Sequence, residues 1–256
     1  MADVHRSAAI GYSRNAEVYV QGRPEYPQEV EQWLRIRLGL REGKTVLDLG
    51  AGTGKFSKWL SSTGAKVTAL DPVAAMLEQI SKEQPGIETK LGSAQSIPLE
   101  SNSLDAVVCA QSFHWFASVA ALAEIRRVLR PGGQLGLIWN VRDESVEWVA
   151  ALTRLIAPFE GGTPRYRTQE WRSLFPAQGF GPIREERFAN DHVGPPEEVI
   201  LARILSVSFI AALRAAERSI VEAQIRQMID STPELAGRAS VKFPYETVAF
   251  SCARLS

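Results

Sequence analysis

Three glycines at alternate positions, Gly50, Gly52 and Gly54, separate the apolar run 45–49 from a segment with a helical pattern. A residue without Cβ readily adopts positive φ and lets a ligand approach the backbone closely. A bare strand-to-helix turn does not require three glycines, each of which loses more conformational entropy on folding than another residue. The sequence therefore predicts a sharp turn around a bound adenosine-like molecule.

The spacing of these glycines excludes two phosphate-binding turns. The dinucleotide fingerprint Gly-x-Gly-x-x-Gly, counted from Gly50, needs its third glycine at position 55, where the chain has Lys55. The P-loop needs Ser or Thr after its lysine, and Phe56 follows Lys55. Neither a pyrophosphate nor a triphosphate site is expected here.

With Asp48 in front, the segment reads Asp-x-Gly-x-Gly-x-Gly, which resembles motif I of the class I methyltransferases. Members of that family use S-adenosyl-L-methionine as the methyl donor and release S-adenosyl-L-homocysteine. Their glycine turn packs against the methionine part of the cofactor, and no diphosphate is bound. The resemblance implies the same cofactor for this chain.

An acidic residue ends the next apolar run, where Asp71 is followed by Pro72, 21 positions after Gly50 (71 − 50). In nucleotide-binding α/β sheets, a carboxylate about 20 residues after the glycine turn accepts hydrogen bonds from ribose hydroxyls. Taken alone, Asp-Pro is a common turn pair. After a glycine turn of this kind, we expect Asp71 to contact the sugar.

Further segments match the same family in order. The run 92–99 followed by 104–110 resembles the adenine-side loop and the fourth strand, and 127–133 resembles the Arg-Val-Leu-Arg-Pro-Gly-Gly turn of small-molecule methyltransferases. Segments 19–27, 111–116 and 138–143 look like a subgroup related to the trans-aconitate and cantharidin-detoxifying enzymes. The resemblance implies these cofactor contacts: Asp48, Gly50, Ala51, Gly52, Gly54, Asp71, Pro72, Ala94, Gln95, Ala110, Gln111, Tyr19 and Arg23.

Alternation of apolar runs with helical patterns predicts an α/β fold with a parallel sheet and helices on both faces. The expected strands are 45–49, 66–70, 87–91, 104–110 and 134–139, then 183–189 and 241–254. The expected helices are 28–40, 55–62, 73–84, 118–129 and 145–157, with a helical piece at 168–178 and a long helical stretch from 197 to about 229.

The predicted architecture is one domain, residues 1–256, with a Rossmann-like sheet of seven mostly parallel strands and an antiparallel last strand. Residues 28–190 and 236–256 form the α/β core. The family resemblance implies an N-terminal flap at 1–27 and a helical lid at 191–235 inserted between the sixth and seventh strands.

Charge and composition narrow the class of partner. Lysine plus arginine equals aspartate plus glutamate at 29 each, so the chain lacks the basic excess of most nucleic-acid-binding proteins. No apolar run approaches the ~18 residues of a membrane span, and the N-terminus has no signal-peptide core. The two cysteines, Cys109 and Cys252, lie in apolar runs, and no Cys/His spacing suggests a metal. We expect a cytoplasmic, metal-free protein that acts on a small molecule.

His114, which follows the fourth strand, is the candidate catalytic residue. A neutral imidazole accepts a proton near pH 7, but a histidine among aromatic neighbours is more often part of a pocket wall than a base. The candidate substrate contacts end the fourth and fifth strands at the same edge: Trp115, Trp139, Asn140 and Arg142. Arg142 is suited to pair with an acceptor carboxylate, and the alternative is that it pairs with nearby acidic side chains of the chain itself.

The leading interpretation is transfer of a methyl group from S-adenosyl-L-methionine to a small organic acceptor, at the oxygen of a carboxylate or hydroxyl, by in-line displacement. A non-catalytic nucleoside-binding or scaffold protein that keeps the fold is the alternative. Lys55 argues against a third class, the nicotinamide-dependent oxidoreductases.

Overall fold

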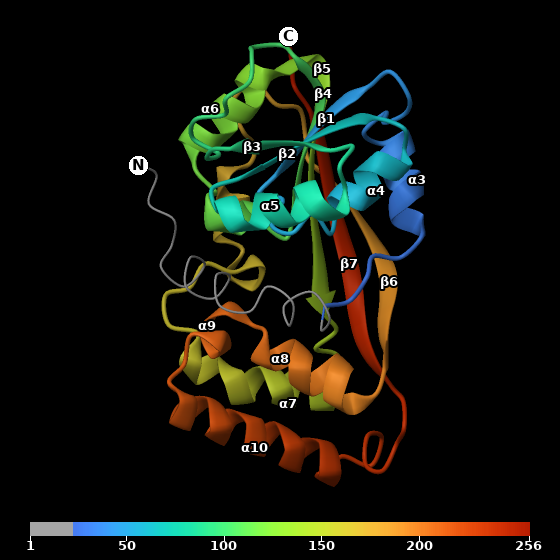
Figure 1. Cartoon of the computed structure of the whole chain (residues 1–256), viewed down its shortest axis with the longest axis vertical. Coiled ribbons are helices and arrows are strands. Elements are labelled where there is room, and N and C mark those ends of the chain that lie inside the picture. The colour runs from blue at the N-terminus through green and yellow to red at the C-terminus, as the bar shows by residue number, and fades with distance from the viewer. Residues whose placement is uncertain (1–22) are drawn as a thin grey trace.

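One mixed sheet of seven strands organises the chain in the computed structural model, which describes residues 23–256 (Figure 1). The strands are β1 (Thr45–Leu49), β2 (Lys66–Asp71), β3 (Glu88–Leu91), β4 (Leu104–Ala110), β5 (Leu129–Arg142), β6 (Arg184–Gly194) and β7 (Val241–Ala253). Their order is β3-β2-β1-β4-β5-β7-β6. β7 runs antiparallel to β5 and β6, and all other strand pairs are parallel, so the predicted fold class is confirmed.

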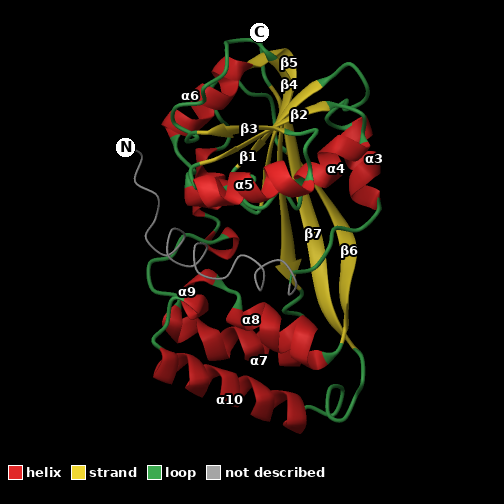
Figure 2. Cartoon of the chain, viewed as in Figure 1, coloured by secondary structure: helices red, strands yellow, loops and turns green. Residues whose placement is uncertain are grey.

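Helices cover both faces of this sheet (Figure 2). The α-helices are α3 (Glu29–Ile36), α4 (Ser57–Ser62), α5 (Ala74–Glu83), α6 (Val119–Val128), α7 (Glu147–Ile156), α8 (Arg203–Leu205), α9 (Ser208–Ala211) and α10 (Ala215–Ser231). Shorter turns are the 3₁₀ segments η1 (Phe113–Trp115), η2 (Ala157–Phe159), η3 (Tyr166–Thr168) and η4 (Glu170–Leu174), and the π-helical η5 (Glu197–Ala202). One hydrophobic cluster joins α3, α4 and α5 to the sheet, and another joins α6 and the η4 region.

The central strands are apolar along their length because both of their faces are covered. Ala106, Val107, Val108 and Cys109 of β4 are fully buried, and Cys252 on β7 is buried as well. Both cysteines are free thiols that pack as small apolar residues, as their sequence context predicted.

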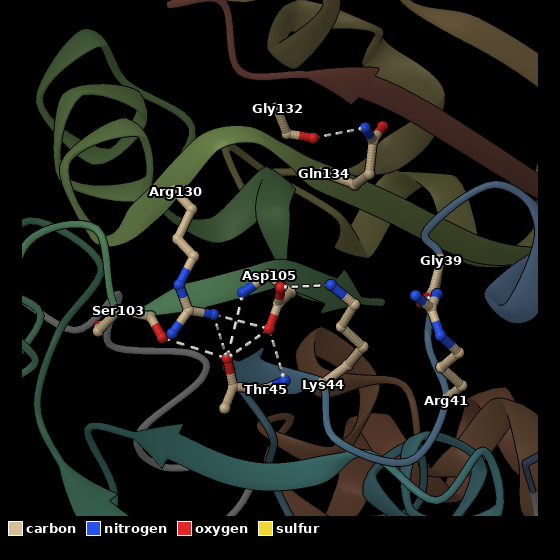
Figure 3. Close-up of polar contacts among 9 residues, drawn as sticks. All are labelled: Gly39, Arg41, Lys44, Thr45, Ser103, Asp105, Arg130, Gly132 and Gln134. Carbon is tan, nitrogen blue, oxygen red and sulfur yellow. Dashed lines mark hydrogen bonds and ion pairs between the residues drawn. The ribbon is translucent and has the colours of Figure 1, made fainter.

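A polar cluster joins the amino ends of β1 and β4, at the edge opposite the glycine turn (Figure 3). Asp105 accepts hydrogen bonds from Lys44 Nζ, from the Thr45 backbone and hydroxyl, and from Arg130 Nη1, at 2.7–2.9 Å. Burial raises the pKa of the Asp105 carboxyl, but the bonds from Lys44 and Thr45 and the charge of Arg130 outweigh it and lower the pKa to about 2. The cluster fixes the register of the two strands at this end.

A helical group lies below the sheet in Figure 1, where α7 meets the insertion between β6 and β7. Its core contains Val149 and Leu152 of α7, Ile200 and Ile204 of the insertion, and Phe243 of β7. The long β6 and β7 reach this group because both strands extend past the edge of the parallel core.

Three helical predictions are wrong in detail. The piece at 168–178 forms 3₁₀ turns, and the stretch 197–229 is interrupted at Val207 and Arg214, whose backbones are extended. The large apolar side chains from Val199 to Ile210 are all buried. A single straight helix buries one stripe, so burial on several sides requires breaks that turn each short segment toward the core. The helix predicted at 28–40 ends at Ile36.

Candidate functional site

The glycine turn lies between β1 and α4, with all three glycines at positive φ: 75° at Gly50, 55° at Gly52 and 78° at Gly54. The turn is tied to β2 because the Gly50 and Ala51 amides both donate to the Leu70 carbonyl, at 2.8 and 3.1 Å. A Cβ on Gly50 would lie 2.7 Å from Ser112 Cβ, whereas a Cβ on Gly52 would meet no atom of the described chain within 4 Å. Gly50 therefore serves packing, and Gly52 leaves space beside the backbone.

Two buried carboxylates flank this turn. Asp71 accepts from the amides of Gly52 and Val73, each at 2.9 Å, so each of its oxygens carries one backbone hydrogen bond and retains a second lone pair. Asp48 accepts from Ser57 Oγ at 2.7 Å through Oδ2, while its buried Oδ1 has no hydrogen-bond partner within residues 23–256. Burial raises the pKa of Asp48 to about 7. The hydrogen bond from Ser57 lowers this pKa, and the charge of Asp71 raises it.

A cavity of about 220 Å³ opens over the turn at the carboxyl ends of the strands. Apolar side chains of Leu70, Met76 and Phe116 contribute to its walls. Its lining includes these predicted cofactor residues: Asp48, Gly50, Ala51, Gly52, Asp71, Pro72, Ala94, Gln95, Ala110, Gln111 and Arg23. Gly54 is not in the lining and instead packs against Ile80 and Gln84, and Tyr19 lies outside the described residues.

Residues 23–26, at the end of the segment that the family resemblance identified as an N-terminal flap, form a strap at this cavity, and Arg23, Pro24 and Tyr26 line it. Lys55 Nζ donates to the Arg23 carbonyl at 2.7 Å and pairs with the Glu25 carboxylate at 2.9 Å. Asn140 Nδ2 and Asn190 Nδ2 both donate to the Glu25 carbonyl, at 3.2 and 2.8 Å. Lys55, which replaces the third glycine of the dinucleotide fingerprint, thus fastens the strap to the turn.

A second cavity, of about 110 Å³, adjoins the first and shares Arg23, Gln111, Trp115, Asn140 and Arg203 with it. The predicted substrate residues Trp115, Trp139, Asn140 and Arg142 all line this second cavity, and so does His114. The structure thus brings the candidate catalytic and substrate residues together next to the candidate cofactor site.

The second cavity also holds side chains that the sequence analysis missed. Arg165 and Arg167 come from the loop at η3, Arg203 from α8, and Tyr245 from β7. In the sequence, the two arginines that flank Tyr166 are only a weak signal of a binding site, because their position in space depends on how the irregular 157–174 segment folds against β5.

His114 is half-buried and accepts a hydrogen bond at Nδ1 from Trp139 Nε1, at 3.1 Å. Burial lowers the pKa of its imidazole to about 3, and the charges of Arg165 and Arg23 lower it further. The ring is therefore neutral at physiological pH. Because Nδ1 is an acceptor, the proton resides on Nε2, and this assignment follows from the hydrogen bond.

No group of three metal-ligating side chains was found among residues 23–256, and none of the helices there is long and apolar enough to cross a bilayer.

Comparisons with known proteins agree with this geometry. Residues 47–137 match the family described as "Methyltransferase domain". An uncharacterized methyltransferase-like protein of Schizosaccharomyces pombe is 37% identical over 234 residues, 91% of each chain. An uncharacterized methyltransferase of Mycobacterium tuberculosis is 35% identical over 243 residues, 95% of each chain. A malonyl-[acyl-carrier protein] O-methyltransferase of Yersinia pestis is 36% identical over 130 residues, 50% of this chain and 48% of that one.

Solved structures share the fold. A protein described as a type II methyltransferase from Anaeromyxobacter dehalogenans superposes with a TM-score of 0.68 at 23% identity, covering 91% of this chain and 97% of the other. A geranyl diphosphate methyltransferase solved in complex with S-adenosylmethionine superposes with a TM-score of 0.51 at 19% identity, covering 89% and 85%. With close relatives along almost the whole chain and the motif I turn in place, this chain belongs to the class I S-adenosylmethionine-dependent methyltransferase family.

Proposed function

We propose that this protein transfers a methyl group from S-adenosyl-L-methionine to an oxygen atom of a small organic acceptor. The observation that carries the proposal is the cavity over the glycine turn, with two buried carboxylates in its wall and a second, polar cavity beside it.

The residues of the first cavity fit the proposed cofactor. The unpartnered Oδ1 of Asp48, a buried acceptor in the described part of the chain, is complementary to an ammonium group. The remaining lone pairs of Asp71 suit a sugar diol, as the position of this carboxylate implied. The space beside Gly52 admits a ligand against the backbone. Ala94 and Gln95 are the proposed adenine-side contacts.

S-adenosyl-L-methionine, when bound, supplies a methyl group on a positively charged sulfur. An acceptor oxygen would bond to this methyl carbon in line with the carbon–sulfur bond, which breaks and leaves its electron pair on sulfur. The protein's part is to orient the reactants, which can account for much of the rate enhancement. A carboxylate oxygen is already nucleophilic at neutral pH and requires no base. The malonyl-[acyl-carrier protein] O-methyltransferase of Yersinia pestis, which matches about half of this chain, is named for methyl transfer to oxygen and so supports an oxygen acceptor.

We further propose that the insertion between β6 and β7 acts as a lid and that the strap belongs to an N-terminal flap. Arg203 of the insertion lines both cavities, and Arg23 of the strap does so from the N-terminal segment. The two segments therefore both contact the space where donor and acceptor would meet.

Calorimetric titration with S-adenosyl-L-homocysteine tests the cofactor assignment. We expect saturable binding to the full chain, weakened by Asp71→Asn roughly tenfold or more because hydrogen bonds to a charged group are lost. The exposed control Asp191→Asn should bind as the wild type does. Absence of binding, or tighter binding of NAD, would contradict the proposal. Tight binding without methyl transfer to any acceptor would support the non-catalytic alternative.

A further inference from the structure

The second cavity carries an excess of positive charge. Its ionisable lining includes Arg142, Arg165, Arg167 and the carboxylate of Glu144. Glu160 is not part of the lining, but it pairs with Arg167 and, at 3.7 Å, with Arg165. Arginines therefore outnumber carboxylates around a small, partly enclosed space.

Arg142 and Tyr245 are neighbours in this lining. They are direct partners in the antiparallel register of β5 and β7, so their side chains emerge from adjacent positions. Arg142 Nη1 and Tyr245 Oη are both buried, and neither has a hydrogen-bond partner in the described portion of the chain. Two neighbouring buried donors without acceptors are uncommon in a folded protein.

The charges of the arginines also favour an anion in this cavity. Burial lowers the pKa of the Arg142 guanidinium, and burial together with the Arg142 charge lowers the pKa of Arg165 to about 10. The Arg165 guanidinium is held over the Phe209 ring, 4.8 Å from its centroid, which fixes it at the cavity. Cations kept close together and partly desolvated destabilise the fold unless an anion joins them.

We propose that the second cavity binds a carboxylate of the methyl acceptor through Arg142, Arg165 and Tyr245, and that this carboxylate is separate from the oxygen that is methylated. The inference rests on the proposed function, since it assigns the acceptor to the cavity beside the cofactor. The acceptor is then an organic acid with a further oxygen nucleophile. Arg142 and Tyr245 supply hydrogen bonds that a planar carboxylate can accept, and Arg165 supplies charge.

The test is calorimetry on the full chain saturated with S-adenosyl-L-homocysteine, using acetate, benzoate, glutarate and citrate as probes and glutaramide as the neutral control. We expect at least one carboxylate to bind and glutaramide not to bind. Arg142→Gln should weaken the binding roughly tenfold or more, as for the loss of a charged hydrogen bond. The matched control is Arg154→Gln, which removes an exposed arginine of α7 that pairs with Glu147. It should leave the affinity unchanged.

A second variant covers the case in which Arg142→Gln does not fold. Tyr245→Phe removes only the hydroxyl and keeps the buried ring, so the same probes should bind several-fold more weakly to it. The proposal is overturned if none of the four carboxylates binds to the saturated wild-type protein, or if both variants bind them with wild-type affinity.

The affinity of each variant for S-adenosyl-L-homocysteine shows whether the cavity binds a carboxylate of the acceptor or the carboxylate of the cofactor. We expect it to match the wild type. A tenfold loss in Arg142→Gln would show that the cavity holds the cofactor's own carboxylate, which also overturns the proposal. If the wild type fails to bind S-adenosyl-L-homocysteine at all, the proposed function fails independently of what the carboxylate probes show.

Discussion

The hydrogen bond between Trp139 and His114 decides what the imidazole can do. Nδ1 already accepts from the indole, so the remaining nitrogen bears the proton and can only donate. A base role would require Nδ1 to release Trp139, whose ring is almost fully buried. His114 is therefore better suited to donate to an acceptor oxygen than to remove a proton.

This tautomer is directly measurable. Because the pKa of His114 is lowered to about 3, its imidazole should stay neutral, with the proton on Nε2, throughout pH 5–9. Nitrogen-detected NMR of the imidazole, assigned by comparison with His114→Gln, should show no titration there. A midpoint near pH 6–7 that disappears in the variant would instead restore the base hypothesis.

Asp48 is predicted to reduce the stability of the ligand-free protein. Its folded-state pKa of about 7 lies above the ordinary 3.8, so the stabilisation present below pH 3.8 is lost as pH rises to about 7. Asp48→Asn should be more stable at pH 8 by roughly 1–3 kcal/mol, since the variant removes a buried charge but adds an amide without an acceptor. Urea unfolding at pH 5 and pH 8 measures the difference, which should shrink at pH 5.

The same substitution should weaken binding of S-adenosyl-L-homocysteine at pH 8 roughly tenfold or more, because the acceptor for the ammonium is lost. A variant that is less stable than the wild type at pH 8 and binds equally well would refute this account of Asp48.

The sequence predicted one side of the site well and the other poorly. Asp48, Gly52 and Asp71 were predictable because each lies at the carboxyl end of a strand or directly after it, where local spacing determines position. Arg165 and Arg203 were not, because they come from irregular segments whose place depends on packing far along the chain. Their charge gave no signal in a chain with balanced composition.

At the scale of elements, strands with continuous burial were predictable to within a residue or two, as β1 and β4 show. β5 was underestimated at both ends. Its start pairs with β4 across an irregularity in register between Leu104 and Ala106, and its last residues pair with β7, which lies more than 100 residues later in the chain. The breaks at Val207, between α8 and α9, and at Arg214, between α9 and α10, had no local turn signal, since they follow from burial on several sides.

The cluster at the amino ends of β1 and β4 yields an element-scale prediction. The folded-state pKa of Asp105, about 2, lies below the ordinary 3.8, so its contribution is present above pH 4 and is lost as pH falls toward 2. Asp105→Asn should lower the free energy of unfolding by about 2 kcal/mol at pH 7. Urea unfolding at pH 7 and pH 3 should show the difference between the wild type and the variant shrinking to roughly half at pH 3.

The exposed Asp230→Asn on α10 is the control for Asp105 and should leave the free energy of unfolding unchanged at both pH values. A gap between the wild type and Asp105→Asn that is the same at pH 7 and pH 3 would mean that the cluster acts by shape and not by charge.

At the scale of the whole molecule, the strap links regions that are distant in sequence. Asn190 of β6 and Asn140 of β5 hold the Glu25 carbonyl, and Lys55 of the glycine turn holds Arg23 and Glu25 from the other side. The strap thus connects β5 and β6 to the first cavity, and β6 leads into the helical insertion. Its position should respond to ligand binding, since Arg23 lines both cavities.

Asn190→Ala tests this connection. It removes the hydrogen bond of 2.8 Å to the strap but no group from either cavity, so residues 23–27 should exchange amide hydrogen faster. Binding of S-adenosyl-L-homocysteine should weaken roughly three- to tenfold, as for the loss of one net hydrogen bond. Hydrogen exchange with mass spectrometry and calorimetry measure the two effects.

The control is Asp191→Ala, at the next residue of β6, which is exposed on the other face. It should change neither the exchange nor the binding. If Asn190→Ala speeds exchange without weakening binding, the strap is a structural brace, and closure over the cofactor must come from the helical insertion alone.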